Sequence, residues 1–137
     1  MDFLDKRVGV ICNELKKLKV KQIFPLTQWE YKEGNFVHPE DALNDAAAWE
    51  NFDCKTMHWY GKDRHYWFRT VYTVTQELDG KNMWIRISSQ IDEWDDAKNP
   101  QFIVFINGEI YQGIDMNHRE CLITQSAKAG DTLTIEL

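Results

Sequence analysis

With 137 residues, 43% of them hydrophobic and 28% charged, the chain has the size and composition of one globular domain rather than of a disordered segment. The net charge of −6 opposes a nucleic-acid partner, which would require a basic surface. The first residues lack the pattern of a signal peptide, and no apolar run is long enough to cross a bilayer. The three cysteines are widely spaced, which predicts reduced thiols. We therefore expect a cytoplasmic protein without membrane contact.

The first expected element is an amphipathic helix within residues 1–21. Its apolar residues recur at helical spacing, with charged residues between them: Leu4, Val8, Ile11, Leu15 and Leu18. Lysines at its end complement the helix dipole. Because a helix of about four turns is marginal by itself, the apolar stripe is expected to dock on this domain or on a missing neighbour.

Residues 22–137 predict a β-sandwich that contains one short helix. Residues 22–37 have an irregular or extended pattern, and Pro39–Trp49, after His38, favours the short helix. Strands are expected from Thr56 onward, over these ranges: His65–Val74, Met83–Ser89, Phe102–Ile106, Glu109–Gln112, Cys121–Thr124 and Thr132–Leu137. Asn107-Gly108 favours a type I′ hairpin, and Gly113 is expected to let the chain leave the sheet. The short strands and frequent turns are typical of a sandwich or jelly roll. The last strand has no tail after it, which indicates a piece of a longer multidomain chain.

An aromatic and imidazole cluster around Trp59 is a candidate sugar platform. It combines Trp59, Tyr60 and His65 with the nearby His58 and Trp67. A platform needs exposed aromatic faces, whereas strand position favours a core role for Trp67 and leaves Trp59 open between the two roles.

Trp94, the remaining platform candidate, lies in an acidic loop with Asp92, Glu93, Asp95 and Asp96. Such a loop could bind calcium, but it lacks the ordered spacing of a calcium loop, so a solvated loop with one docked Trp is favoured. These local carboxylates also give no sign of the facing pair that glycoside hydrolysis needs. The sequence offers neither a serine-nucleophile elbow nor a phosphate-binding glycine loop, so we expect no catalytic residue in this chain.

Three segments resemble a known family. They are His65-Tyr66-Trp67-Phe68-Arg69, Phe105-x-Asn107-Gly108 and Gln112-Gly113-Ile114-Asp115-x-Asn117-His118-Arg119-Glu120. From about Val20 onward the chain resembles the N-terminal domain of cytosolic-type α-mannosidases of glycoside hydrolase family 38. The resemblance implies a galactose-binding-like β-sandwich that precedes a catalytic domain. That catalytic domain supplies the carboxylate nucleophile and a metal, usually zinc, so the piece itself is expected to hold no cofactor.

The loop Asp115–Glu120 is the most specific part of the resemblance and the main candidate site. We expect Asn117, His118 and Arg119 to anchor the loop by hydrogen bonds and to dock it on the catalytic domain or at the substrate entrance. An ion pair of Arg119 with Glu120 or Asp115 inside the domain is the competing interpretation. Asp115, His118 and Glu120 could also ligate a metal, although hydrogen bonding is the commoner role of such residues in loops.

Three functions follow, in order of preference. The first is a non-catalytic N-terminal domain that packs on the catalytic domain of the same chain or at a homo-oligomer interface. The second is an autonomous carbohydrate-binding module that binds a glycan through Trp59, Tyr60 and Trp94. The third is a small metalloenzyme built on His58, His65, Asp115 and His118.

Overall fold

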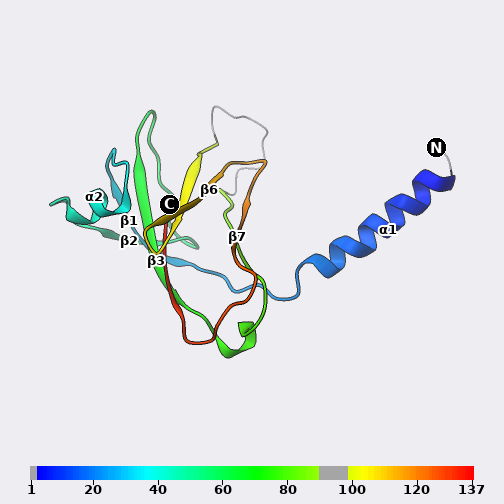
Figure 1. The fold of residues 1–137 in the computed structure, drawn as a ribbon. Coiled ribbons are helices and arrows are strands. Elements are labelled where there is room, and N and C mark those ends of the chain that lie inside the picture. The colour runs from blue at the N-terminus through cyan, green and yellow to red at the C-terminus, as the bar shows by residue number, and fades with distance from the viewer. Residues whose placement is uncertain (1–2, 90–98) are drawn as a thin grey trace.

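The structure is a computed structural model that describes residues 3–89 and 99–137 (Figure 1). The chain is mainly β, as predicted, with two antiparallel sheets and a long N-terminal helix. The helices are α1 (Phe3–Lys19), α2 (Pro39–Asn44) and the short 3-10 helix η1 (Gln76–Leu78). The strands are β1 (Gln28–Glu33), β2 (Glu50–Asp53), β3 (Tyr66–Thr73), β4 (Met83–Arg86), β5 (Phe102–Ile106), β6 (Glu109–Ile114), β7 (Glu120–Thr124) and β8 (Thr132–Glu136).

The strands form two layers, as expected for a β-sandwich. The larger sheet has six strands in the order β2-β1-β3-β8-β5-β6, and β4 pairs with β7 in a second, two-stranded sheet. Every described strand pair is antiparallel. The central strands β3 and β8 are built from β-branched and aromatic residues, which suit a pleated surface covered on both faces.

The space between the two sheets holds the main core. Phe68 lies opposite Tyr31, and Thr70 lies opposite Ile135, so alternate residues of β1, β3 and β8 point to the same inner face. The buried members of this core are Trp29, Phe52, Phe68, Ile85, Val104, Ile106, Ile114, Cys121 and Ile135. On β4 the residues alternate between the two faces, because Met83 and Ile85 are buried whereas Trp84 and Arg86 are exposed.

The outer face of the large sheet carries a smaller core under α2. Trp67 and Phe105, with ring centroids 5.6 Å apart, pack with Ala42 of α2 against the partly buried Phe36 and Trp49. The predicted core position of Trp67 is confirmed, since 6% of its surface is exposed. The ring lies on the outer face, because its neighbours in β3, Tyr66 and Phe68, pack in the main core and successive side chains of a strand point to opposite faces.

Three sequence predictions need correction. Strands begin at β1 and β2, well before Thr56, because the short alternating segment Gln28–Glu33 finds partners on both sides. The predicted helix over Pro39–Trp49 ends at Asn44, since Asp45 adopts an extended backbone with ψ of 140°. The chain does not leave the sheet at Gly113, which pairs with Ile103 inside β6.

The turn between β5 and β6 has the predicted geometry. Asn107 and Gly108 both have positive φ, at 52° and 82°, as a type I′ hairpin requires. The Asn107 side chain adds a link to the neighbouring strand, because its Oδ1 accepts a hydrogen bond of 2.8 Å from the Thr134 backbone N–H. The hairpin is therefore fixed to the centre of the large sheet.

Candidate functional site

The connection from β6 to β7 forms a turn that is held by the Asp115 carboxylate. One oxygen, Oδ1, accepts hydrogen bonds from the backbone N–H groups of Asn117 (2.8 Å) and His118 (2.7 Å). The same oxygen lies 3.1 Å from Nδ1 of His118. The backbone hydrogen bond from His118, followed by that from Asn117, lowers the pKa of Asp115 below its ordinary value of 3.8. The turn thus fixes its own shape as Asx turns do.

The other residues of this turn complete its internal bonding. Arg119 donates from Nε to the carbonyl oxygen of Met116 at 2.9 Å. The side chain of His118 is 73% exposed and Asn117 is also exposed, so both face solvent. We call residues 115–119 the Asp115 turn. Its hydrogen bonding agrees with the predicted anchoring, and its outward side chains form a polar corner at the surface.

Glu120 does not join the Asp115 turn. It begins β7, and its carboxylate lies 2.6 Å from Nζ of Lys19 at the end of α1. Its carbonyl oxygen accepts a hydrogen bond of 2.9 Å from Nε2 of Gln112. Over residues 3–89 and 99–137, no group of three or more His, Cys, Asp or Glu side chains is arranged to hold a metal ion.

The candidate sugar platform is divided between core and surface. Trp59 is partly buried, and its ring packs edge-on against Phe68 at 4.9 Å and Phe52 at 6.0 Å between centroids. Tyr60 is 83% exposed, and its carbonyl oxygen accepts a hydrogen bond of 2.7 Å from the Tyr66 hydroxyl. His65 is exposed immediately before β3. Trp94 lies outside the described residues, as do the acidic residues around it, so Tyr60 and His65 are the exposed platform members in the described part.

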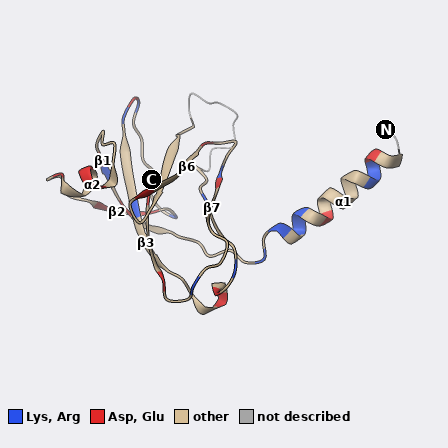
Figure 2. Cartoon of the chain, in the orientation of Figure 1, with Lys and Arg blue, Asp and Glu red and all other residues tan. Residues whose placement is uncertain are grey.

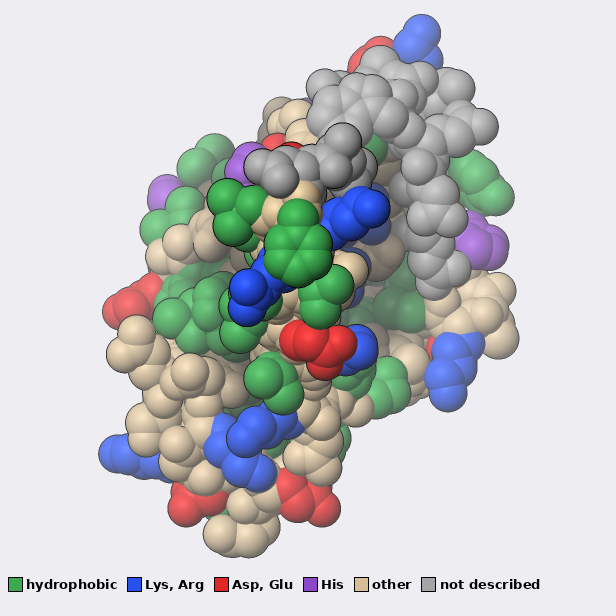
Figure 3. Space-filling model, turned by 90° about the vertical axis from the view of Figure 1, so that its right-hand side faces the viewer, with side chains coloured by type: hydrophobic (Ala, Val, Ile, Leu, Met, Phe, Trp, Pro, Cys, Tyr) green, Lys and Arg blue, Asp and Glu red, His purple; other side chains and the backbone are tan. Residues whose placement is uncertain are grey.

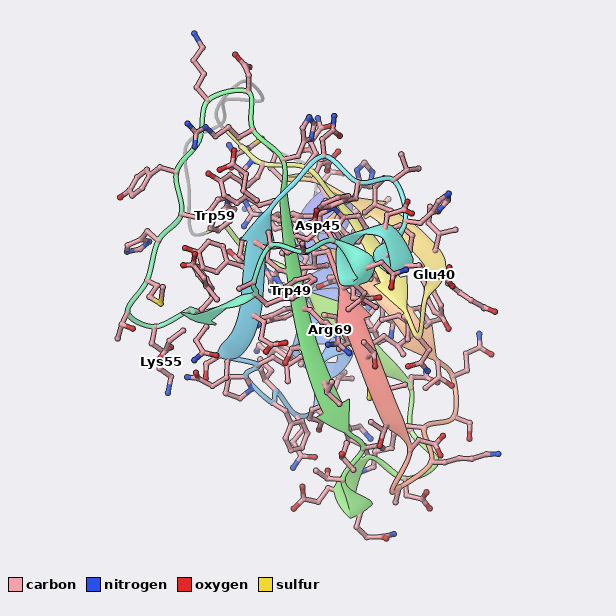
Figure 4. The ribbon with its side chains drawn as sticks, turned by 90° about the vertical axis from the view of Figure 1, so that its left-hand side faces the viewer. Glu40, Asp45, Trp49, Lys55, Trp59 and Arg69 are labelled. Carbon is pink, nitrogen blue, oxygen red and sulfur yellow. The ribbon has the colours of Figure 1, made fainter. Side chains whose placement is uncertain are left out.

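Sequence reasoning missed a buried cation on the outer face of the large sheet. Lys32 on β1 is 4% exposed, and its Nζ lies 3.2 Å from Oδ2 of Asp45 and 3.3 Å from the Ala47 carbonyl oxygen. The rings of Phe36 and Trp49 lie 5.3 and 5.2 Å from the same nitrogen, within cation–π range. Figure 4 shows Asp45 and Trp49 in the segment that covers this face of the sheet. Lys32 therefore fastens the segment after α2 to β1.

A second polar group lies beside it, on the neighbouring strands. Arg69 of β3 is opposite Glu30 of β1 and Glu136 of β8, with nitrogen–oxygen distances of 3.9 and 3.8 Å. Glu136 is 3% exposed, and its burial raises the pKa of its carboxyl group although the charge of Arg69 opposes this. Nε of Arg69 is buried without a hydrogen-bond partner among the described residues. The group is an ionic ladder across three strands of the sheet.

An apolar cleft with a volume of about 940 Å³ lies between the two sheets. The core aromatics Trp29, Phe68 and Phe102 line it, together with the segment of residues 18–26 and strand β4. Glu120 is the one carboxylate among its lining residues, so the cleft does not present the two facing acids of a glycosidase site. The Tyr72 hydroxyl, buried without a partner among the described atoms, also belongs to this lining. The cleft is open because a six-stranded sheet faces only two strands in the described part of the second layer.

Among the described residues, no helix has the length and apolarity needed to cross a membrane. A comparison of the chain with protein-family models, with curated proteins and with solved structures found no match. The function must therefore be argued from the residues and from the surfaces described above.

Proposed function

We propose that this chain is the non-catalytic N-terminal module of a cytoplasmic α-mannosidase, with a galactose-binding-like jelly-roll fold. The parent enzyme would hydrolyse α-mannosidic bonds with a divalent metal, zinc or another, held in its catalytic domain. The module would pack against that catalytic domain or at a subunit interface. The observation that carries the proposal is the Asp115 turn, because the segment with the most specific family resemblance forms a self-bonded corner with exposed polar side chains.

The chemistry of this corner favours docking over catalysis. The Asp115 carboxylate is occupied by two backbone N–H groups, so it is a poor candidate for a general base. The His118 ring and the Asn117 amide are exposed next to it and can donate or accept hydrogen bonds across an interface. Because the turn is already ordered, little conformational entropy would be lost when a partner surface covers it.

Two linked experiments test the proposal. The open reading frame beyond Leu137 is expected to continue into a large catalytic domain, and the full-length product is expected to hydrolyse an aryl α-mannoside. The 137-residue chain is expected to show no hydrolysis of the same substrate, with or without added zinc. Turnover by the pure chain would contradict the non-catalytic role, and a reading frame without a mannosidase domain would remove the parent enzyme.

A paired substitution tests the docking role of the Asp115 turn in the full-length protein. The double variant Asn117→Ala/His118→Ala removes the exposed side chains, including the exposed contact of His118 with Asp115, and leaves the Asp115 hydrogen bonds to backbone N–H groups in place. We expect lower thermal stability of the full-length enzyme but a change of less than about 0.5 kcal/mol in the 137-residue chain. Lys128→Ala, at an exposed site between β7 and β8, is the matched control and should alter neither. Equal losses in the two proteins would show a role within the module instead.

The alternative function, an autonomous carbohydrate-binding module, is supported by the exposed ring of Tyr60. The hydrogen bond from Tyr66 holds the Tyr60 backbone, so the ring projects from an ordered segment. Tyr60 offers one exposed aromatic ring, and His58, two residues earlier, is also exposed, which together make a minimal sugar contact. Because Trp59 is committed to the core, this alternative ranks below the docking role.

A further inference from the structure

Helix α1 extends away from the sandwich (Figure 1); Lys19 at its end pairs with Glu120 of β7, and every residue of the helix is exposed. All of its residues are described, and none is buried. The five apolar residues of its stripe are between 50% and 71% exposed: Leu4, Val8, Ile11, Leu15 and Leu18. Figure 3 views the face from which the helix projects and shows hydrophobic side chains mixed with Lys and Arg at the surface. An isolated helix of this length is marginal in water, so burial of the stripe is needed to stabilise it.

The spacing of the stripe indicates what covers it. Successive members are separated by four, three, four and three residues, which is the strict seven-residue repeat of a coiled-coil seam. Val8 and Leu15 occupy the a positions, and Leu4, Ile11 and Leu18 occupy the d positions. Val8 at a with Leu4 and Leu18 at d follows the preference of two-stranded coiled coils, whereas Leu15 at a with Ile11 at d follows that of larger assemblies, so the charges beside the seam decide the number of helices. A helix that packed on a broad globular surface would show a wider apolar face.

The charges beside the seam are balanced, although α1 as a whole is basic. Asp5 and Lys19 occupy e positions, and Arg7 and Glu14 occupy g positions, so each sign appears twice along the seam. The excess lysines, Lys6, Lys16 and Lys17, lie at the f, b and c positions, away from the seam. Figure 2 shows Lys and Arg as blue bands near the end of the helix that joins the sandwich. In a parallel pair, Glu14 of one copy faces Lys19 of the other on both sides of the seam, in exchange for the present ion pairs of Glu14 with Lys17 and of Lys19 with Glu120. The helix surface is therefore electrostatically complementary to a second copy of itself.

We propose that α1 is a dimerisation element that pairs with α1 of a second copy as a parallel two-stranded coiled coil. A helix of 17 residues gives a seam about 25 Å long, and a pair of such seams buries on the order of 1,000 Å². That area is at the lower limit of specific interfaces, so the dimer is expected to dissociate in the micromolar range. This inference is independent of the proposed mannosidase parent, because it depends only on the seam and on the exposure of α1.

Other coverings of the stripe fit the observations less well. Outside α1 and the segment after it, the inter-sheet cleft is bordered by the basic side chains Lys81 and Arg86, and Glu120, the one acidic side chain in its lining, is already paired with Lys19. A basic helix would not be attracted to such a rim. A membrane surface would attract the lysines, but it would not require the strict seven-residue spacing or the acidic Glu14 beside the seam.

Sedimentation analysis of the 137-residue protein over a range from about 1 to about 500 μM tests the proposal. We expect a reversible monomer–dimer equilibrium, with a helical circular dichroism signal that rises with protein concentration. Ile11→Asp places a charge in the seam and should reduce the association constant at least about 100-fold. Val10→Asp is the matched control, since Val10 is 62% exposed and lies away from the seam, and it should dimerise like the parent protein.

Several results would overturn the proposal. These are a protein that stays monomeric throughout the range, an assembly larger than a dimer, or equal effects of Ile11→Asp and Val10→Asp. Association of the monomer with phosphatidylglycerol–phosphatidylcholine vesicles that Ile11→Asp abolishes would assign the stripe to a membrane surface instead. A monomer in which Ile11→Asp lowers the stability of the sandwich would assign it to the cleft.

A cysteine crosslink tests the parallel orientation. Leu15→Cys is introduced into a Cys12→Ser background, in which the remaining cysteines, Cys54 and Cys121, are not exposed. In the parallel pair the two introduced thiols face each other across an a layer, close enough to form a disulfide on mild oxidation. In an antiparallel pair they would lie at different levels of the seam. Failure to form the crosslink in a protein that dimerises would contradict the parallel arrangement.

Discussion

Replacing Lys32 by methionine should destabilise the sandwich by about 2 kcal/mol. The Lys32 ammonium group is almost fully buried and makes one hydrogen bond to the Asp45 carboxylate and others to backbone carbonyl oxygens. A charge-assisted hydrogen bond of this kind contributes about 1.5–3 kcal/mol, and contacts with the Phe36 and Trp49 rings add about 0.5–1 kcal/mol each. Methionine keeps the apolar stem and removes the cost of burying a charge, which offsets part of this loss. The Asp45 side chain is 36% exposed, so water can solvate it after the change.

Thermal unfolding followed by far-ultraviolet circular dichroism measures this effect. For a chain of 137 residues, a loss of about 2 kcal/mol corresponds to a decrease of roughly 7 °C in Tm. Lys55→Met is the matched control, because Lys55 is exposed and Figure 4 shows its side chain directed away from the sheet. The control should change the stability by less than about 0.5 kcal/mol.

A double-mutant cycle separates the ion pair from the packing. Lys32→Met and Asp45→Asn, singly and together, should show a coupling energy of about 1 kcal/mol, since the two charged groups are 3.2 Å apart. If Lys32→Met matches the parent protein within about 0.5 kcal/mol, the burial of this cation is not a source of stability and the reasoning is refuted.

Four further predictions concern pH, a buried acid, the core and sugar binding. Hydrogen bonds lower the pKa of both Asp45 and Asp115. The contribution of the two carboxylates to stability should therefore be complete above about pH 5 and should disappear as the pH falls below 3.8, their ordinary pKa. The stability of Asp115→Asn should depend less on pH in this acidic range than that of the parent protein. Burial raises the pKa of Glu136, so the native state binds a proton on this carboxyl group more tightly than the unfolded state does. Glu136→Gln should therefore stabilise the protein by about 1 kcal/mol near pH 7, and this gain should vanish below pH 4.5, the ordinary pKa of the group. A loss of stability at pH 7 would show that the pair with Arg69 dominates. The side chain of Ile135 is 1% exposed, and Ile135→Ala should reduce the unfolding free energy, measured by urea denaturation, by about 2–3 kcal/mol. Ile110 is 68% exposed, and the control Ile110→Ala should change the unfolding free energy by less than about 0.5 kcal/mol. Titration with mannose or mannobiose should leave the tryptophan fluorescence unchanged, and a saturable response would favour the carbohydrate-binding alternative.

The sequence predicted those features that depend on neighbouring residues. Helix α1, the β5–β6 hairpin at Asn107-Gly108 and the alternation of Met83–Arg86 each follow from local periodicity or turn chemistry, and the structure confirms them. The Asp115 turn belongs to the same class, because a short polar side chain can accept hydrogen bonds from the backbone two and three residues later.

Features that depend on strand pairing could not be predicted in the same way. The short strands β1 and β2 have weak local signals, and they become strands because their backbone groups pair with each other and with β3. The local sequence predicts that the chain leaves the sheet at Gly113, but strand pairing with Ile103 of β5 keeps Gly113 in β6. The sequence alone does not decide whether Trp59 belongs to a sugar platform or to the core; its ring contact with Phe68 in the folded chain assigns it to the core.

The sequence by itself determined the β-rich class, the seven-residue repeat of α1 and the motif that forms the Asp115 turn, since each is encoded within a few consecutive residues. Only the tertiary structure decided that Lys32 is buried under Trp49 and that Arg69 joins Glu30 and Glu136 across three strands. The partners of these charges are distant in sequence, and their environment exists only when the strands are paired. The desolvation that controls such buried groups is a property of the folded packing rather than of the local sequence.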